Sequence, residues 1–296
     1  MWASHSRVRL AARSYSCVGL RCAQRCGEKI GTDCETDRSG IMNDFEVRIT
    51  TDANEIREAQ RLRFQVFNLE MNKGLQASYA RGLDSDYLDP ICDHLIVRDL
   101  KSKEVVGTYR LLLGSRAEKN GGFYSNREFN LENIKQLDGE LLELGRSCAR
   151  KDFRDKALIL LMWNAIAEYV KKHRVRYLFG CGSLYTTDIT EVRAYFSMLQ
   201  RKYYAAEMLR VHPVPEFRFE GITDNSNAAE DDVLFLKLPS LIKGYLRLGA
   251  VVCGPPALDR EFGTTDVLIL LDMHKLKRGY LFRVGQIGTR VCRAVA

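Results

Sequence analysis

Long hydrophobic runs are missing from this 296-residue sequence. The longest apolar stretches, residues 158–163 and 267–271, are far shorter than the roughly 20 residues that a helix needs to cross a bilayer. Residues 1–26 also lack the apolar core of a secretory signal. We therefore expect a cytoplasmic protein that does not span a membrane, with peripheral contact at the inner face of the cytoplasmic membrane left open.

A basic stripe interleaved with aromatic residues is missing too. The net charge is +7, and residues 1–41 supply +3 of it, with seven basic and four acidic side chains. The rest of the excess is modest and scattered, which argues against nucleic acid as a partner. A small basic excess instead suits an acidic protein partner or an anionic membrane surface.

Cysteine pairs with the C-x-x-C spacing are also absent. Four of the nine cysteines, Cys17, Cys22, Cys26 and Cys34, lie near the amino terminus, and their spacing does not match the C-x-x-C pairs of zinc sites. The other five are isolated along the chain. We therefore expect no metal site, and the odd total without a secretory signal favours a reducing compartment.

The first 41 residues do not follow the pattern of the rest. Residues 1–26 carry five arginines, several serines and no acidic residue, which is typical of a mitochondrial targeting segment. The alternative is a mis-called start with the true start at Met42, and we favour it because regular periodicity begins only there. We expect the folded domain to cover residues 42–275, with residues 276–296 as a basic tail.

Hydrophobic periodicity from Met42 onward predicts strands and helices in mixed order. The expected strands are residues 45–49, 94–98, 105–113, 141–149, 176–181 and 266–271. The expected helices are residues 53–70, 157–172, 189–210 and 238–248. This order, without internal repeats, predicts an α+β fold with a mixed central sheet and helices on both faces. The polar stretch 72–93 contains several large residues, so we interpret it as an active-site loop.

Two groups of charged residues are candidates for chemistry. Asp84, Asp86 and Asp89 lie in the long loop, either as solvated acids or as carboxylates that bind a cationic amine. Glu143 and Arg146 lie in an otherwise apolar strand, where ionised groups are costly unless paired. They form either a structural ion pair or part of a catalytic site.

A glycine between Glu143 and Arg146 affects which face of the strand each side chain points to. Strict alternation along a strand would place Glu143 and Arg146 on opposite faces. Gly145 predicts a bulge that re-aims one of them. A buried glutamate beside a cleft is a candidate general base, because burial raises its pKa.

His94 and Asp99 match H-x-x-x-x-D, the dyad pattern of glycerolipid O-acyltransferases. On a strand, residues at this spacing point to opposite faces and cannot share a hydrogen bond. We interpret this match as chance.

A glycine-rich phosphate loop is missing. Acetyl-CoA-dependent transferases of the GNAT fold cradle the pyrophosphate with an R/Q-x-x-G-x-G/A loop, whereas residues 150–157 here contain no glycine. The basic side chains of Arg150, Lys151, Arg154 and Lys156 are instead a candidate docking surface for an acidic carrier protein. The alternative is an ordinary solvated turn.

Ordered motifs over residues 45–272 resemble those of the bacterial ornithine-lipid N-acyltransferases. They include Arg61-Leu-Arg63-Phe-x-Val-Phe67, Asp84-x-Asp86-x-x-Asp89, Val106-Gly-Thr-Tyr-Arg110, Glu128-Phe129, Glu143-Leu-Gly-Arg146 and Asp259-x-x-Phe262-x-Thr-Thr-Asp266. The resemblance implies a GNAT-like acyl-CoA N-acyltransferase fold, as in acyl-homoserine-lactone synthases and N-acyl amino acid synthases. It also implies transfer of a 3-hydroxy fatty acyl group from acyl carrier protein to the α-amine of L-ornithine, the first step of ornithine lipid synthesis.

The resemblance also assigns expected roles to residues. Glu143 helps deprotonate the acceptor amine, with Arg146 as its catalytic partner. The acceptor site is shaped by Arg63, Phe67, Asp86, Asp89 and Arg110. The donor carries its own phosphopantetheine, so no further cofactor is expected.

An acyl chain requires an apolar slot, for which the aromatic candidates are Phe123, Trp163, Phe179 and Tyr185. The segment 238–248, with Lys243 and Arg247, is a candidate for contact with the inner leaflet, the alternative being a packed helix. Glycine, lysine or tyrosine as the acceptor remains open. So do quorum-signal synthesis and a non-catalytic protein that binds lipid or carrier.

Overall fold

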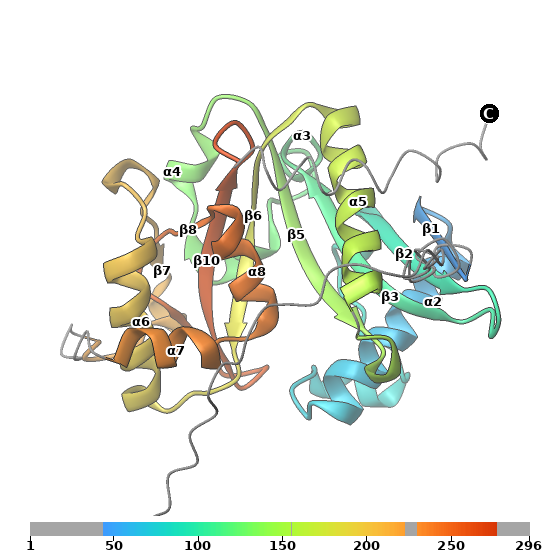
Figure 1. Cartoon of the computed structure of the whole chain (residues 1–296), viewed down its shortest axis with the longest axis horizontal. Helices are drawn as coiled ribbons and strands as arrows, with labels where there is room; N and C mark the ends of the chain where they lie inside the picture. Colours follow the sequence, from blue (N-terminus) through green and yellow to red (C-terminus); the bar gives the residue numbers. More distant parts are fainter. Residues whose placement is uncertain (1–43, 155, 223–229, 277–296) are drawn as a thin grey trace, which may run out of the picture. The chain divides into compact units, whose positions relative to one another are not determined.

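The structure, a computed structural model, describes residues 44–154, 156–222 and 230–276 (Figure 1). The expected extension, residues 1–41, and nearly all of the expected basic tail lie outside the described residues. No described helix is long and apolar enough to cross a membrane.

A mixed sheet of eight strands forms the centre of the domain. Its neighbours run in the order β1-β2-β3-β5-β6-β10-β8, with β9 paired to β10. All of these neighbours are antiparallel except β5 and β6, which are parallel. The strands are β1 (Phe45–Thr50), β2 (Asp93–Asp99), β3 (Val105–Leu113), β5 (Glu140–Ala149), β6 (Val175–Leu184), β8 (Val251–Val252), β9 (Ala257–Asp259) and β10 (Thr264–Asp272). Two short strands, β4 (Phe129–Asn130) and β7 (His212–Pro213), pair separately.

Helices connect and cover these strands. The α-helices are α2 (Ala53–Arg63), α3 (Gly114–Ala117), α4 (Glu132–Lys135), α5 (Lys156–His173), α6 (Ile189–Tyr203), α7 (Asp231–Lys237) and α8 (Ser240–Leu248). Helix α2 continues as a π-helix, η1 (Phe64–Glu70). Short 3-10 helices are η2 (Gln76–Ala80), η3 (Asp89–Ile91), η4 (Tyr124–Arg127), η5 (Lys151–Phe153), η6 (Glu207–Leu209) and η7 (Pro215–Phe217). The expected helix over residues 189–210 therefore ends early, at Tyr203.

Alternating residues of β2 show that helices lie on both faces of the sheet, as predicted. Leu95 and Val97 belong to the same buried cluster as Leu158 of α5. Ile96, which points to the other face, packs in a cluster with Leu62 of α2. Since side chains alternate along a strand, α5 and α2 cover opposite faces.

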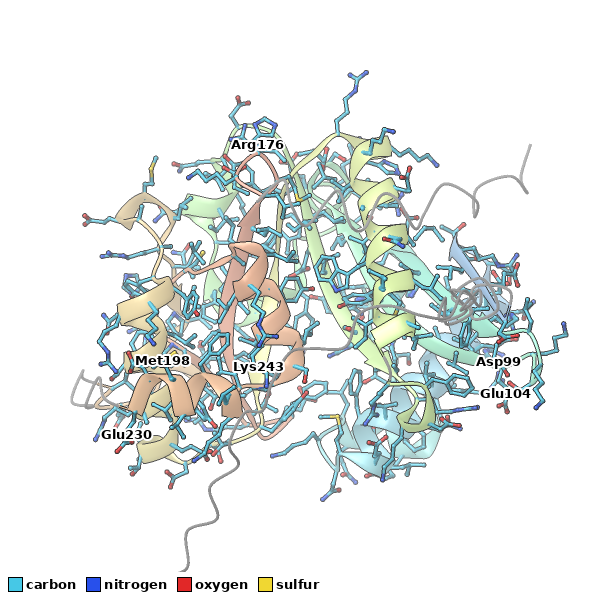
Figure 2. The ribbon with its side chains drawn as sticks, viewed as in Figure 1. Asp99, Glu104, Arg176, Met198, Glu230 and Lys243 are labelled. Atoms are coloured by element: carbon cyan, nitrogen blue, oxygen red, sulfur yellow. The ribbon has the colours of Figure 1, made fainter. Side chains whose placement is uncertain are left out.

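Helix α8 packs against the sheet. Its Ile242 and Leu246 are buried in the cluster that includes Ile269 of β10. Lys243, labelled in Figure 2, donates a hydrogen bond of 2.8 Å to the carbonyl oxygen of Leu236. The apolar face of this helix is therefore occupied within the protein, which favours the packed-helix alternative.

The parallel pair β5–β6 separates along its length, as Figure 1 shows. Their register runs from Glu140 with Val175 only as far as Glu143 with Phe179. Beyond those residues both strands continue, but they no longer pair with each other. The two strand ends therefore diverge and leave a gap in the middle of the sheet.

Candidate active site

A cavity of about 1280 Å³, including its open mouth, occupies the gap between β5 and β6. Because side chains alternate along the strands, one side of the cavity is apolar and the other is polar. On the side of α8, the wall is apolar and includes Leu178, Leu241, Ile242, Tyr245, Ile269 and Leu271. The opposite side carries polar groups, which include Arg110, Glu143, Cys181, Asp259 and Asp266. The cavity therefore suits a ligand with an apolar chain and a charged head.

Glu143 lies in this cavity where β5 leaves β6. Its Oε1 accepts hydrogen bonds from the backbone nitrogen of Ser125 at 2.8 Å and from Ser125 Oγ at 2.6 Å. Its Oε2 accepts one from the backbone nitrogen of Tyr124 at 2.8 Å. Burial raises the pKa of Glu143 and outweighs the opposing effect of these donors. The predicted direction of the pKa shift is confirmed, and it suits a group that accepts a proton near neutral pH.

Arg146 reaches the same cavity through a β-bulge. The register passes from Thr108 with Cys148 to Arg110 with Gly145, so two residues of β5 oppose one of β3. Arg146 has a φ of +48°, a left-handed conformation that costs roughly 1–2 kcal/mol for a residue other than glycine. The predicted bulge is confirmed, although the unusual backbone falls on Arg146 and not on Gly145.

The Arg146 guanidinium lies between two aromatic rings. Its Cζ is 4.8 Å from the ring centroid of Tyr124 and 4.8 Å from that of Phe262. A guanidinium over an aromatic face is electrostatically favourable, most of all where water is excluded. The two rings hold the arginine in place in the cavity that Glu143 also lines.

The three loop aspartates are paired with arginines. Arg63 donates to both carboxylate oxygens of Asp89, at 2.9 and 2.7 Å, and to Asp84 at 3.0 Å. Arg110 lies 2.6 Å from Asp86 and 3.1 Å from Asp89. Three carboxylates thus meet three guanidinium groups, since Arg146 also belongs to the cluster.

Arg146 completes the charge balance from the cavity side. Its Nη2 lies 3.1 Å from Asp86 and its Nε 3.4 Å from Asp84. Burial opposes ionisation of Asp86, but Arg110 and Arg146 outweigh it and lower its pKa. Burial likewise opposes ionisation of Asp89, and Arg63 and Arg110 lower its pKa well below the usual range. The three aspartates therefore serve as ion-pair partners of the arginines, which corrects the expectation that they bind a cationic amine.

The residues expected to shape the acceptor site divide into two sets. Phe67 and Arg110 line the cavity. Arg63, Asp86 and Asp89 are not among the lining residues, and Arg63 is fully buried. Asp86 and Asp89 pair with Arg110. Asp86 also pairs with Arg146, and Arg63 in turn holds Asp89, so these residues are placed to position the two arginines of the cavity.

The four aromatic candidates for the acyl slot divide in the same way. Phe179 and Tyr185 line the cavity. Phe123 does not, because it packs edge-on against Phe179 with ring centroids 4.9 Å apart. Trp163 packs against Tyr245 at 5.1 Å and is also absent from the wall. Sequence alone missed the apolar wall that α8 provides, since that helix lies far along the chain.

The basic segment after β5 forms local ion pairs. Arg150 contacts Asp152 at 2.8 Å and stacks on Phe153 at 4.5 Å. Arg154 donates to Glu70 at 2.5 and 2.7 Å. Lys151 is exposed, and the side chain of Lys156 lies outside the described part of the chain. These pairs are exposed and therefore weak.

His94 and Asp99 form no dyad, as predicted. His94 is buried, and its Nε2 lies 3.0 Å from the carbonyl oxygen of Asp89. Asp99 lies at the β2–β3 hairpin beside Glu104 (Figure 2), where it accepts a hydrogen bond from the backbone nitrogen of Ser102 at 2.8 Å.

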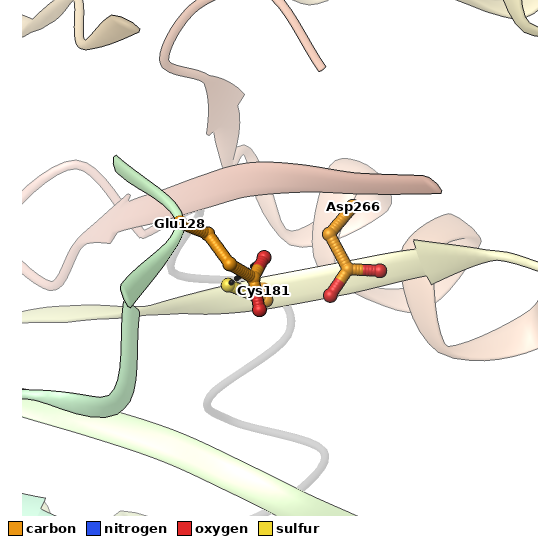
Figure 3. A group of neighbouring side chains, drawn as sticks. All are labelled: Glu128, Cys181 and Asp266. Atoms are coloured by element: carbon orange, nitrogen blue, oxygen red, sulfur yellow. Dashed lines mark hydrogen bonds between the residues drawn. The ribbon is translucent and has the colours of Figure 1, made fainter. Parts of the chain in front are cut away.

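A second acidic group at the cavity carried no assigned role in the sequence analysis. Figure 3 shows Glu128, Cys181 and Asp266 gathered together, each with one ligand-type atom within 4.8 Å of the others. Asp259 also lines the cavity. The motifs around Glu128 and from Asp259 to Asp266 were the available signal, but nothing in the sequence brings these distant segments together.

Comparison with known proteins identifies the family of the chain. Residues 62–164 match the acetyltransferase (GNAT) domain. An L-ornithine Nα-acyltransferase of Rhodobacter capsulatus is 38% identical over 234 residues, which are 77% of this chain and 90% of that protein. One of Brucella abortus is 34% identical over 260 residues, or 85% of this chain and 92% of that protein. The crystal structure of the AHL synthase LasI aligns with a TM-score of 0.45 at 15% identity, over 77% of this chain and 89% of that one. The expected GNAT-like fold and N-acyltransferase class are confirmed, and the chain belongs to the L-ornithine Nα-acyltransferase family.

Proposed function

We propose that the protein transfers a 3-hydroxy fatty acyl group from acyl carrier protein to the α-amine of L-ornithine, forming lyso-ornithine lipid. The names of its relatives support ornithine as the acceptor. The observation that supports this reaction is the position of Glu143. It is a buried carboxylate with a raised pKa, and it lines a cavity that has one apolar wall and one polar wall.

The reaction is the aminolysis of a thioester. The neutral α-amine attacks the carbonyl carbon, the carbon–sulfur bond breaks, and the phosphopantetheine thiolate leaves. The amine gives up a proton, which Glu143 accepts through one water molecule, and the thiolate takes up a proton to become a thiol. A base whose pKa lies near the operating pH performs this transfer best, and burial brings Glu143 towards that range.

The tetrahedral intermediate places negative charge on the former carbonyl oxygen. Hydrogen-bond donors fixed in advance stabilise such an oxyanion. Beyond the last register pair, Glu143 with Phe179, the facing edges of β5 and β6 no longer pair with each other. Backbone N–H groups along these edges are therefore in a position to donate to the oxyanion.

The donor fits the rest of the cavity region. An acyl chain would lie along Leu241, Ile242 and Ile269, since an apolar wall removes its surface from water.

The segment around Arg150 and Arg154 would face the acidic carrier protein. Its ion pairs are exposed, so they can exchange partners at small cost.

The test is a mass-spectrometric assay of the full chain with 3-hydroxypalmitoyl carrier protein, the matching CoA thioester and a mixture of ornithine, glycine, lysine and tyrosine. We expect acyl-ornithine to form fastest with the carrier-protein donor. We expect Glu143→Gln to lower the rate about 100-fold or more, the size of a general-base contribution. Glu168→Gln, on the exposed face of α5, is the control and should keep full activity.

Each part of the proposal has its own contrary result. A different dominant acyl amino acid would remove ornithine as the acceptor. Equal rates with the CoA thioester would remove the carrier protein as the required donor. Full activity of Glu143→Gln would make Glu143 a structural residue.

A further inference from the structure

The two acidic groups beside the cavity differ in their counterions. Asp84, Asp86 and Asp89 face three arginines. Glu128, Asp259 and Asp266 form no ion pair with any described lysine, arginine or histidine. Their side chains are nevertheless buried, with residue exposures of 1%, 4% and 4%. The second group therefore has no ion-pair partner among the described residues, and the Arg127 guanidinium interacts with Asp259 without pairing with it.

These three residues also face the cavity or adjoin its wall. Asp259 and Asp266 line it from β9 and β10. Glu128, at the end of η4, lies behind Cys181 of the wall, with its Oε2 3.4 Å from the Cys181 sulfur. Its Oε1 is buried and has no hydrogen-bond partner among the described residues. Glu128 also shares a side-chain hydrogen bond with Asp266, which links it to the lining of the cavity, and one of its oxygens stays without a partner.

Close acids in a buried site repel one another. Burial raises the pKa of Glu128 well above its ordinary value, and the neighbouring Asp266 and Asp259 raise it further. Burial also raises the pKa of Asp266 to about 6, with Asp259 adding to the effect. A bound cation would reverse this trend, because an opposite charge within a few ångströms favours the ionised carboxylates.

We infer that Glu128, Asp259 and Asp266 form the subsite that receives the side-chain ammonium of a diamino acid acceptor and leaves its α-amine to Glu143. This inference rests on the proposed function and assigns the residues that select the acceptor. An ammonium group supplies several hydrogen-bond donors as well as charge, so it satisfies the open oxygen of Glu128 and the carboxylates of the wall together.

The distance between the subsite and the base fits such an acceptor. Ser125 Oγ lies 2.6 Å from Glu143 Oε1 and 3.3 Å from the Cys181 sulfur, which in turn is 3.4 Å from Glu128. The separation of Glu143 and Glu128 is at most the length of these three contacts. The two nitrogens of ornithine are joined by five bonds of about 1.5 Å and lie about 6 Å apart when extended. One acceptor molecule can therefore reach both groups.

The subsite would select by charge. A site built for a buried polar group rejects an analogue that lacks it, because its own polar groups are then left unpaired. Norvaline has the carbon chain of ornithine without the second amine. We expect the wild-type protein to prefer ornithine over norvaline by about 100-fold or more in kcat/KM.

The experiment measures kcat/KM for both acceptors with 3-hydroxypalmitoyl carrier protein as the donor, using the full chain. Asp266→Asn removes one charge at nearly constant shape. It should lower kcat/KM for ornithine about tenfold or more and change the value for norvaline less than about threefold, so the preference falls. Asp272→Asn is the matched control, because Asp272 is on the same strand, pairs with Arg176 and does not line the cavity.

An unchanged ornithine-to-norvaline ratio in Asp266→Asn would overturn the inference while the proposed function stands. Failure of the wild-type protein to acylate ornithine would instead remove the proposed function itself. If Asp266→Asn does not fold, Asp259→Asn and Glu128→Gln report on the same ratio. A stoichiometric metal ion in the purified wild-type protein, lost in Asp266→Asn, would assign the cluster to metal binding and also overturn the inference.

Discussion

Ser125 donates two hydrogen bonds to a single oxygen of Glu143, from its backbone nitrogen at 2.8 Å and from its hydroxyl at 2.6 Å. Both residues are buried, and the same hydroxyl lies 3.3 Å from the Cys181 sulfur. Burial raises the pKa of Glu143, and the donors from Ser125 lower it. Ser125 therefore helps to set the pH at which Glu143 is ready to accept a proton.

Removing the hydroxyl should move the pH dependence of catalysis. Hydrogen bonds to the carboxylate favour its ionised form, so Ser125→Ala should raise the pKa of Glu143 further. The base is active when it is ionised. Activity is lost as pH falls through this pKa, so the midpoint of that acid limb should move to higher pH. The measurement is kcat/KM against pH.

Ser197→Ala is the control for this experiment. Ser197 is buried in α6, and its hydroxyl has no hydrogen-bond partner among the described residues. Its removal makes the same change in size without touching Glu143, so the acid limb should stay in place. An unmoved limb in Ser125→Ala as well would mean that Glu143 does not govern the pH dependence.

Asp89 should contribute strongly to stability. Asp89→Asn leaves Arg63 short of its bidentate partner in a buried site, where breaking such a pair costs about 3–5 kcal/mol. Urea unfolding measures this loss. Asp152→Asn, which removes an exposed partner of Arg150, should change the free energy of unfolding little. A small effect of Asp89→Asn would show that water reaches the cluster.

The lowered pKa of Asp89 predicts how the stability of the protein changes at acid pH. The pKa of Asp89 is lower in the folded protein than the ordinary value near 3.9 in unfolded chains. Its stabilising contribution is therefore present above about pH 4 and is lost as pH falls through the folded pKa. The fall in wild-type stability below about pH 4 should be shallower in Asp89→Asn, as followed by circular dichroism during acid titration.

The sequence predicted best the elements whose signals are local. Strand β3 was expected over residues 105–113 and has those bounds, because a polar turn at residues 99–103 precedes it and most of its residues are apolar. Helix α2 begins at residue 53 as expected, and the side chain of Asp52 caps it by accepting hydrogen bonds from the backbone nitrogens of Asn54 and Glu55. Short strands such as β8 were missed because two residues carry no periodicity.

The candidate site was predictable only where a single segment defines it. Gly145 marked the bulge that turns Arg146, since glycine within a strand is itself a signal. The partners of Asp89 were not predictable, because Arg63 and Arg110 come from other elements. Glu128 and Asp266 are far apart in the sequence, and only the folded sheet brings their carboxyl groups together.

Gly180 should be needed at the point where β5 and β6 separate. A Cβ at this position would collide with the carbonyl oxygen of Leu144, a backbone atom that cannot move cheaply. Gly180→Ala should lower the free energy of unfolding by about 1–3 kcal/mol and reduce activity by distorting the cavity wall. Thermal melting and the acylation rate measure the two effects.

Gly244→Ala is the opposite case and the natural comparison. Gly244 lies within α8 and a Cβ there would meet no atom within 4 Å. Alanine favours a helix over glycine by about 0.5–1 kcal/mol, so this variant should be slightly more stable than wild type. Equal tolerance of alanine at both positions would mean that β5 can shift away from β6 freely.

Leu241 should influence which acyl chains the protein accepts. It is partly buried and belongs to the apolar wall that α8 presents to the cavity. Leu241→Trp would fill part of that space, so kcat/KM should fall more for a donor with a long acyl chain than for one with a short chain. We expect the ratio of kcat/KM for 3-hydroxypalmitoyl to that for 3-hydroxydodecanoyl carrier protein to fall about tenfold, in line with the value of a few methylene groups in a pocket. Leu236→Trp, at an exposed position on α7, adds the same bulk outside the cavity and should leave the ratio unchanged. If kcat/KM falls equally for both donors in Leu241→Trp, then Leu241 supports the cavity in general and does not select the length of the acyl chain.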